Sequence, residues 1–394
     1  MSQTWNQHVV KKENKALVLE TIKEKAPISR ASIAQVTGLN KGTVSSLVSE
    51  LIDEKLTNES GTGESSGGRR PVMLLLNETA GYTISIDLGV KSILGVLTDL
   101  RGNILHEKRT LFNNNNVEEV LHLLYKLIDE LGVAAPDSEY GIVGIGVGVP
   151  GGVVTTEGEI LLAPNLGWKK VPLSQLLSEK YQVPITVENE ANAGAYGEKV
   201  YGVGQLSSEL VYASVGIGIG VGLILDGKLY RGLRGFSGEL GHMTIEKDGA
   251  VCRCGNKGCW ELYASEQALL KQAEKNGYVN ATVEEIVIAA NNGEANAINM
   301  LAQLGDYLGG VGITNIIHIF NPEQVVMGNT LQSAEKFIMP AIEKRIENNA
   351  IGFNKNDVQL NMSKLKKHST VMGMAAFTIE SFYITRGNER VTIS

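Results

Sequence analysis

The chain has 394 residues, of which 43% are hydrophobic and 45 are glycine, and its formal net charge is −7. That length is enough for two or three domains with cores of their own, and the negative charge argues against a protein that only binds nucleic acid. No apolar run approaches the length of a membrane span, and the polar start at residues 1–15 lacks the apolar core of a signal peptide. We therefore expect a cytoplasmic protein without membrane contact.

The charge is unevenly distributed along the chain. Residues 1–76 hold ten Lys and Arg against eight Asp and Glu, whereas the remainder holds 26 against 35. A mildly basic head on an acidic body is typical of a DNA-binding module fused to a ligand-binding module. We therefore treat residues 1–76 as one predicted domain.

Apolar residues recur with a helical period over residues 14–25, and Pro27 ends that helix. Ser29 can cap a second helix, and Asn40 can cap a third helix after a tight turn at Gly38. Two short helices joined by a glycine-containing turn predict a helix-turn-helix, whose second helix enters the major groove of DNA. The alternative is a generic three-helix bundle.

Strand-like residues 56–59 and 71–76 flank a Gly/Ser-rich tip that ends in two arginines. This pattern predicts a winged helix-turn-helix, with the wing arginines along phosphates or in a minor groove; a flexible linker is the alternative. Short hydrogen-bonding side chains on the third helix would allow close approach to bases. The residues predicted to contact DNA are Ser29, Arg30, Asn40, Lys41, Thr43, Ser45, Ser46, Arg69 and Arg70.

From residue 77 onward the chain alternates between strand and helix patterns. Strands are expected at 82–87, 93–99, 104–109, 142–146, 185–188, 211–214, 222–226 and 324–327. Helices are expected at 117–131, 173–181, 265–276, 282–290, 295–317, 334–348 and 371–383. The same order of elements begins at residue 82 and again at residue 211: a strand, a glycine-rich turn, a second strand and a turn of the Asp-Gly type. This repetition predicts a duplicated α/β unit. We assign residues 77–190 to a first lobe and 191–394 to a second.

All three cysteines, Cys252, Cys254 and Cys259, lie within eight residues, and His242 precedes them by ten positions. Three thiolates and one imidazole make a closed tetrahedral shell, which predicts one structural Zn²⁺ per chain. Gly255 and other glycines beside the cysteines would allow the tight folding that such a site needs. The alternative is three buried thiols beside a coincidental histidine, and a disulfide framework is not expected.

The sequences GELGH at 238–242 and CRCGNKGCWE at 252–261 resemble the signature of the ROK family of bacterial repressors and sugar kinases. That resemblance implies a duplicated actin- and hexokinase-like (ribonuclease H-like) two-lobe body with a sugar in the cleft. It also implies a bifunctional His242, with one ring nitrogen on zinc and the other facing the ligand. The expected sugar-binding residues are Gly151, Asn189, Glu190, Glu239, His242 and Glu261.

Residues 146–151 match the GxGxxG fingerprint of dinucleotide-binding proteins. The following residues 152–156 do not predict a helix, so no helix N-terminus would face a pyrophosphate. Dinucleotide binding is therefore not expected, and the chain has no GxxxxGK[ST] loop either.

The resemblance to kinases of the ROK family implies four motifs for ATP binding and phosphoryl transfer, and this chain differs from each of them. The first phosphate turn of the kinases reads roughly Asp-x-Gly-Gly-Thr, whereas residues 87–91 of this chain read Asp-Leu-Gly-Val-Lys. The second turn of the kinases carries Gly-Thr-Gly, whereas residues 216–218 read Gly-Ile-Gly. Their Gly-Gly beside adenosine is Gly-Asn at 328–329, and their catalytic Asp is Glu190. The extra methylene moves a general base by about an ångström, which costs roughly a hundredfold in rate. No catalytic residue is therefore predicted, and we expect a regulator rather than an enzyme.

The head, the zinc motif and the sugar-facing set together predict a sugar-responsive transcriptional repressor. Resemblance of the whole chain to regulators of the family implies D-xylose or a related aldose as inducer and xylose-utilisation genes as targets. A palindromic operator and a homodimer are expected, because one helix-turn-helix covers too little DNA. The alternatives are an ATP-dependent sugar kinase with a DNA-binding head and, less favoured, a nucleic-acid enzyme on the same fold.

Overall fold

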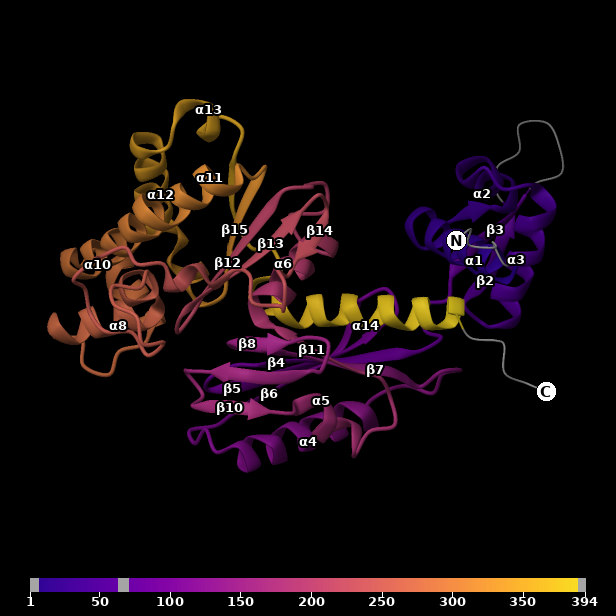
Figure 1. The fold of residues 1–394 in the computed structure, drawn as a ribbon, viewed down its shortest axis with the longest axis horizontal. Helices are drawn as coiled ribbons and strands as arrows, with labels where there is room; N and C mark the ends of the chain where they lie inside the picture. The colour runs from indigo at the N-terminus through magenta and orange to yellow at the C-terminus, as the bar shows by residue number, and fades with distance from the viewer. Residues whose placement is uncertain (1–6, 63–70, 389–394) are drawn as a thin grey trace.

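The computed structural model describes residues 7–62 and 71–388, and Figure 1 shows a small head beside a body of two lobes. The head contains α1 (Gln7–Lys25), α2 (Arg30–Thr37), α3 (Lys41–Asp53), β1 (Ile28–Ser29), β2 (Thr57–Thr62) and β3 (Val72–Leu76). Its three strands pair in the order β1-β3-β2. This is a winged helix-turn-helix, and the prediction for the head is confirmed.

The predicted helix boundaries of the head have visible physical causes. The Ser29 hydroxyl accepts a hydrogen bond from the backbone N–H of Ser32 at 3.1 Å, and Asn40 Oδ1 accepts one from Thr43 at 2.8 Å, so each residue caps a helix. Gly38 has φ 72° and ends α2 in the left-handed conformation that permits the tight turn.

The body contains two sheets of five strands each. The first has the order β11-β7-β4-β5-β6 and the second the order β14-β13-β12-β15-β16. In each sheet the first three strands in sequence are antiparallel neighbours, and the last two run parallel to the first. The repeated strand order confirms the predicted duplication and the two-lobe architecture.

The elements of the first lobe are β4 (Tyr82–Leu88), β5 (Ser92–Asp99), β6 (Ile104–Leu111), α4 (Val117–Val133), β7 (Ile142–Val149), β8 (Gly152–Val154), β9 (Glu159–Ala163), β10 (Trp168–Val171), α5 (Leu173–Ser178) and β11 (Ile185–Asn189). The helix α4 covers one face of the sheet (Figure 1). The small sheet β10-β9-β8 was not predicted. The strand β8 directly follows the GxGxxG match, so no helix begins there, as the sequence indicated.

The second lobe begins with α6 (Glu190–Val200), β12 (Leu210–Val215), β13 (Ile219–Leu225), β14 (Lys228–Tyr230), η1 (Glu239–His242), α7 (Glu261–Ala264) and α8 (Glu266–Lys275). It continues with α9 (Val283–Asn291), α10 (Ala295–Tyr307), η2 (Leu308–Ile313), α11 (Thr314–Phe320), β15 (Gln324–Gly328), η3 (Thr330–Ala334), α12 (Glu335–Asn349), α13 (Gly352–Lys355), β16 (Gln359–Met362) and η4 (Lys366–His368). The chain then forms α14 (Ser369–Asn388).

One predicted helix differs from the structure. Residues 295–317 were expected to form a single α-helix, but the π-helical turn η2 separates α10 from α11. A methyl group on Gly312 would lie 1.8 Å from the Trp260 ring, so the glycine is needed for close packing. The Thr314 hydroxyl donates to the carbonyl of Gly309 at 2.7 Å and stabilises the wider turn.

The helix α14 runs from the space between the lobes to the head (Figure 1). Its backbone lies so close to α6 that a methyl group on Gly373 would be 1.7 Å from the carbonyl oxygen of Ala193. Its far half enters the core of the head, where Ile379 and Phe382 pack in the same cluster as Val18 and Ile22 of α1. The last helix of the chain thus contacts both the body and the first domain.

Among the described helices, none combines the length and apolar character that crossing a membrane requires.

Candidate functional site

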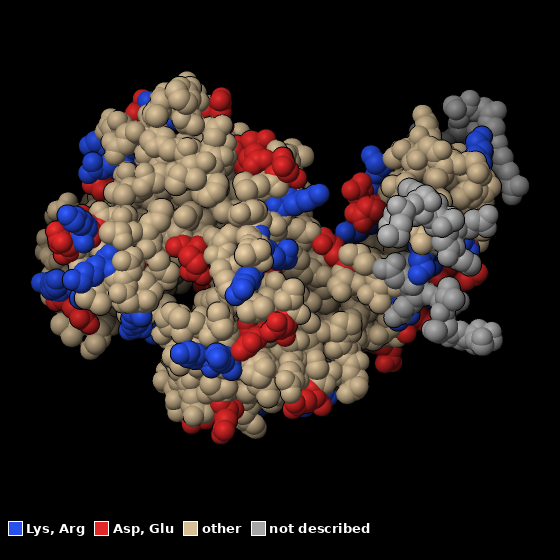
Figure 2. All heavy atoms as spheres, in the orientation of Figure 1, with Lys and Arg blue, Asp and Glu red and all other residues tan. Residues whose placement is uncertain are grey.

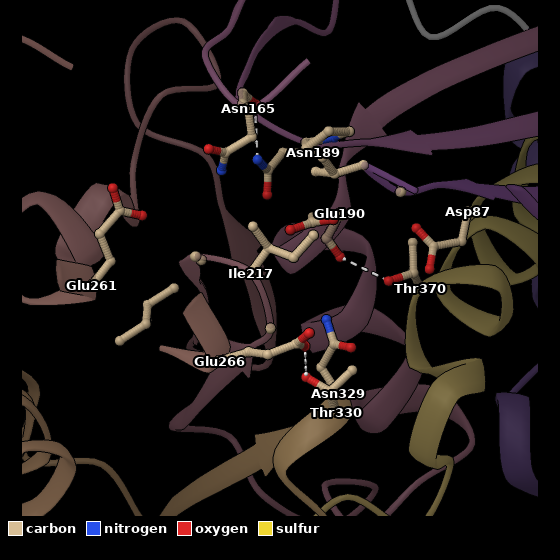
Figure 3. Close-up of a pocket in the computed structure, with 18 of the residues that line it drawn as sticks. Asp87, Asn165, Asn189, Glu190, Ile217, Glu261, Glu266, Asn329, Thr330 and Thr370 are labelled. Atoms are coloured by element: carbon tan, nitrogen blue, oxygen red, sulfur yellow. Dashed lines mark hydrogen bonds between the residues drawn. The ribbon is translucent and has the colours of Figure 1, made fainter. Parts of the chain in front are cut away.

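A pocket with a volume of about 470 Å³ lies between the two lobes, within the range of small-molecule sites. The surface is hollowed between the lobes in Figure 2. All six residues of the predicted sugar-binding set line this pocket. Glu190 and Glu261 come from opposite sides of it in Figure 3.

Asn189 and Gly151 form a fixed corner of the pocket. Asn189 Oδ1 accepts hydrogen bonds from the backbone of Ala191 at 2.8 Å and of Asn192 at 3.1 Å, and so caps α6. Its Nδ2 donates to the carbonyl of Gly151 at 2.9 Å. Since Gly151 has φ 87° and a methyl group there would meet the carbonyl of Leu162 at 2.3 Å, only glycine fits this turn. Asn189 therefore positions the start of α6 and retains one amide hydrogen for a ligand.

Two carboxyl groups lie half-buried at the base of the pocket. Burial, together with the charges of Asp87 and Glu239, raises the pKa of Glu190 to about 8. Burial raises the pKa of Asp87 to about 7, against the opposing effect of the Arg109 guanidinium. Oδ1 of Asp87 is buried and has no hydrogen-bond partner among the described residues. From its sequence, Asp87 is predicted only as part of a phosphate turn, and its pairing with Glu190 is not predicted.

The carboxyl pair predicts a dependence of stability on pH. Both groups bind their proton more tightly in the folded chain than in the unfolded chain, so ionising them costs stability as the pH rises from about 4.5 to about 8. Replacing Glu190 by Gln removes part of this cost. We expect the free energy of unfolding of Glu190→Gln, relative to the unaltered chain, to increase by on the order of 1 to 2 kcal/mol across this window.

Urea unfolding followed by circular dichroism at several pH values between 4.5 and 8.5 measures this difference. The control is Glu157→Gln, which changes an exposed carboxyl of the first lobe. A difference for Glu190→Gln that stays constant over the pH range would contradict the expectation.

The turn η1 carries Glu239 and His242 to the other side of the pocket. Gly238 has φ 86°, and a methyl group there would lie 1.9 Å from the carbonyl oxygen of Val221. The turn can therefore pack directly on β13 only with glycine at this position. Burial raises the pKa of Glu239, with the His242 ring acting in the opposite direction. Glu239 Oε2 lies 3.8 Å from His242 Nε2, so this ring nitrogen points toward the pocket.

The other nitrogen of His242 faces the cysteines. Nδ1 lies 3.7 Å from Cys252 Sγ, and the Sγ atoms of Cys254 and Cys259 are 3.7 Å apart. The four potential ligand atoms all lie within 4.8 Å of one another. Two thiolates bound tetrahedrally at about 2.3 Å from one zinc ion would be about 3.8 Å apart, so the cluster has the dimensions of a metal site. Gly255 has φ 95° in the loop between the cysteines, as predicted.

Glu261 and one residue that was not predicted from the sequence also line the pocket. Glu261 Oε1 lies 3.1 Å from Cys252 Sγ and 3.5 Å from His242 Nδ1, which ties α7 to the cysteine cluster. Asn165 lines the pocket from the turn between β9 and β10, and its Oδ1 accepts a hydrogen bond from Arg253 at 3.3 Å. A polar residue after proline in a short turn was the only sequence signal for Asn165.

The residues at which the sequence is expected to depart from the kinase motifs lie around the same pocket. Val90, Lys91, Glu190, Ile217 and Asn329 all line it, and Ile217 stands near its centre in Figure 3. The Asn329 amide donates to the Ser214 hydroxyl at 3.1 Å, so it is held against β12.

The predicted DNA-binding residues lie on the head in different environments. Asn40, Lys41, Ser45 and Ser46 are exposed at and after the start of α3, and Thr43 is half-buried. Ser29 is buried at its capping position, and Arg30 forms an ion pair of 2.9 Å with Glu59 on β2. The predicted wing residues Arg69 and Arg70 lie outside the described residues.

Comparison with known proteins shows the family to which this chain belongs. Residues 83–381 match the ROK family, and residues 13–56 match a winged helix-turn-helix DNA-binding family. The chain is 42% identical over 377 residues to the xylose repressor of Bacillus spizizenii, a match that covers 96% of this chain and 97% of the relative.

Two solved structures are also similar. One is a ROK family transcriptional regulator described as a homolog of the E. coli MLC protein, with a TM-score of 0.83 and 30% identity over 96% of this chain and 98% of the other. The second is a ROK family glucokinase from Streptomyces griseus in complex with glucose and AMPPNP, with a TM-score of 0.70 and 26% identity over 75% of this chain and 99% of the kinase. The chain therefore belongs to the ROK family and is one of its transcriptional regulators, homologous to xylose repressors.

Proposed function

We propose that the chain represses genes of aldose utilisation, most directly those for xylose, and leaves its operator when D-xylose binds between the lobes. The observation that carries this proposal is similarity to a xylose repressor over 96% of the chain, which includes the head and both lobes. The polar pocket between the lobes supports it, because carboxylates and amides can pair with the vicinal hydroxyls of a sugar ring.

In this proposal the sugar connects two structural groups. Asn189 and Glu190 stand at the start of α6, whereas Glu239 and His242 belong to η1 and Glu261 to α7. A sugar that contacts both groups stabilises a closed arrangement of the lobes, which is a hinge motion between two states. Closure changes the distance between the two heads of a dimer. The heads then no longer match the distance between the two half-sites of a palindromic operator.

The coupling that release requires is modest. A hundredfold loss of operator affinity corresponds to about 2.7 kcal/mol, which is within the usual range for allosteric proteins. Linkage then requires operator DNA to weaken sugar binding by the same factor.

We propose one structural Zn²⁺ held by His242, Cys252, Cys254 and Cys259. The ligand distances described above support this assignment, and a closed shell of four ligands leaves no open position for catalysis. The ion would fix the loop that carries Glu239 and Glu261. His242 would bind the metal through Nδ1 and present Nε2 to the ligand.

The outward face of α3 is our proposed recognition surface, with the protein acting as a homodimer in the cytoplasm. Replacing Lys41, exposed at the start of α3, by Ala is expected to weaken binding to all DNA sequences and to lower the salt slope by about one. Ser46→Ala is expected instead to change the preference among operator variants. Fluorescence anisotropy at several salt concentrations measures both effects.

The matched control is Lys247→Ala, which removes the same charge from an exposed position of the second lobe. If Lys41→Ala and Lys247→Ala bound operator with equal affinity and equal salt slope, α3 would not be the DNA-binding surface.

Titration of an operator complex with D-xylose tests the proposed function directly. We expect about a hundredfold loss of operator affinity at saturating xylose. The structural similarity to a glucokinase makes sugar phosphorylation the alternative. Formation of ADP and a sugar phosphate from ATP and an aldose would support the kinase and contradict the proposal.

A further inference from the structure

A single arginine of the second lobe connects the sugar pocket to the helix that reaches the head. Arg231 directly follows β14, and its Nε donates to Glu188 Oε2 of β11 at 2.6 Å. Its guanidinium also lies 5.1 Å from the centroid of the Phe377 ring on α14, within cation–π range. Arg231 therefore contacts the first lobe and α14 at the same time.

Glu188 connects this arginine to the pocket. Its carboxylate is 2% exposed, and its Oε1 accepts hydrogen bonds from the backbone of Asn189 at 2.9 Å and from the Asn192 side chain at 3.1 Å. Asn189 lines the pocket, so Glu188 is one residue away from the proposed sugar contacts. A buried carboxylate with three hydrogen-bonding partners has one well-defined position, and Arg231 is its charged partner.

The loop after Arg231 leads to the opposite side of the pocket. The Ser237 backbone N–H donates to the Arg231 carbonyl at 3.2 Å, and its hydroxyl donates to the Tyr230 carbonyl at 2.6 Å, so residues 231–237 form a closed loop. Glu239 follows two residues later in η1. Arg231 and Glu239 are therefore joined by a short segment that is closed by its own hydrogen bonds.

On α14, the contact continues toward the head. The Phe377 ring stacks on Tyr196 of α6 with centroids 4.4 Å apart, and the Tyr196 hydroxyl donates to Glu380 at 2.5 Å. Burial raises the pKa of Glu380, whereas the hydrogen bond from Tyr196 and the charges of Lys23 on α1 and of Arg231 lower it. On either side of Phe377, Ala375 and Ile379 of α14 belong to the core that α14 shares with α1.

We propose that Arg231 is the residue that transmits lobe closure to α14 and thereby to the DNA-binding head. The inference rests on the proposed function, since it assigns a route for the release that the sugar causes. Closure moves the loop of Arg231 together with Glu239, and the guanidinium passes that movement to Phe377. Arg231 is a positioning residue: it does not line the pocket and does not belong to the head.

The test compares Arg231→Gln with Arg234→Gln, which removes the same charge from an exposed position three residues away. We expect Arg231→Gln to bind xylose without DNA, and operator without xylose, within about threefold of the unaltered chain. The ratio of operator affinities without and with saturating xylose is expected to fall from about a hundredfold to below tenfold, a loss of more than 1.4 kcal/mol of coupling. A residue needed only for folding would not change this ratio while both separate affinities stay constant.

A second variant covers the case in which Arg231→Gln does not fold. Phe377→Leu retains the apolar contact with α6 and removes the aromatic face, and it is expected to reduce the same ratio. If both variants fold, their effects on the coupling free energy should be non-additive, because they interrupt one contact.

The outcomes separate the two proposals. If xylose does not change the operator affinity of the unaltered chain, the proposed function is contradicted, and this inference is contradicted with it. If the unaltered chain responds and Arg231→Gln or Phe377→Leu responds equally, only the role of Arg231 is overturned.

Discussion

Glu239→Ala is expected to leave operator binding intact and to abolish release by xylose, so that the genes under its control stay repressed. Glu239 lines the pocket at the start of η1 and lies far from the head in sequence. Each hydrogen bond between a sugar hydroxyl and a charged carboxylate contributes about 1.5 to 3 kcal/mol. Losing two such bonds lowers xylose affinity by at least about a hundredfold.

Calorimetry with xylose and anisotropy with operator DNA measure the two affinities of this variant. Glu246→Ala is the matched control, because Glu246 is an exposed glutamate of the same segment that does not line the pocket. Release of Glu239→Ala from its operator at the xylose concentration that releases the unaltered chain would exclude Glu239 from the sugar site.

Cys259→Ser is expected to lose the metal and, with it, the response to sugar. Cys259 is fully buried and lies between Gly258 and Trp260, which carries the loop into the core of the second lobe. Zinc binding contributes about 10 to 16 kcal/mol to the folding of small zinc sites, so the loop that positions His242 and Glu261 should become disordered without it. Operator binding should persist, because no residue of the cysteine loop belongs to the core that α1 to α3 share with α14.

Metal analysis and xylose calorimetry on the purified variant check this expectation. The control is Lys257→Ser, which changes an exposed side chain of the same loop and leaves the four ligands in place. About one zinc per chain in the unaltered protein and in Lys257→Ser, but well under one in Cys259→Ser, is the expected result. Zinc bound equally by all three proteins would contradict the assignment of Cys259 as a ligand.

The features predicted correctly from sequence are those with a short-range signal. The caps at Ser29 and Asn40 depend on residues within three positions, and the cysteine cluster lies in one loop. The duplicated lobes were readable because each repeats the same order of apolar strands and glycine turns. The residues expected to bind a sugar followed from family resemblance, and all of them line one pocket.

The features that were missed depend on contacts between distant segments. The strands β8 to β10 are three to five residues long, which leaves too few residues for a periodic signal, and Asn165 was lost with them. The pairing of Asp87 with Glu190 unites the ends of two strands far apart in sequence. The contact of Arg231 with Glu188 and Phe377 joins three segments, and no local pattern indicates it.

The core of the head also has a consequence for how the chain folds during synthesis. Val18 and Ile22, near the start of the chain, pack in one cluster with Ile379 and Phe382, near its end. The ribosome therefore releases the N-terminal domain long before the residues that complete its apolar interior have been made. Until α14 emerges and docks, that domain leaves part of its apolar surface to the solvent. A head with a fully packed core is therefore expected only once translation has passed α14.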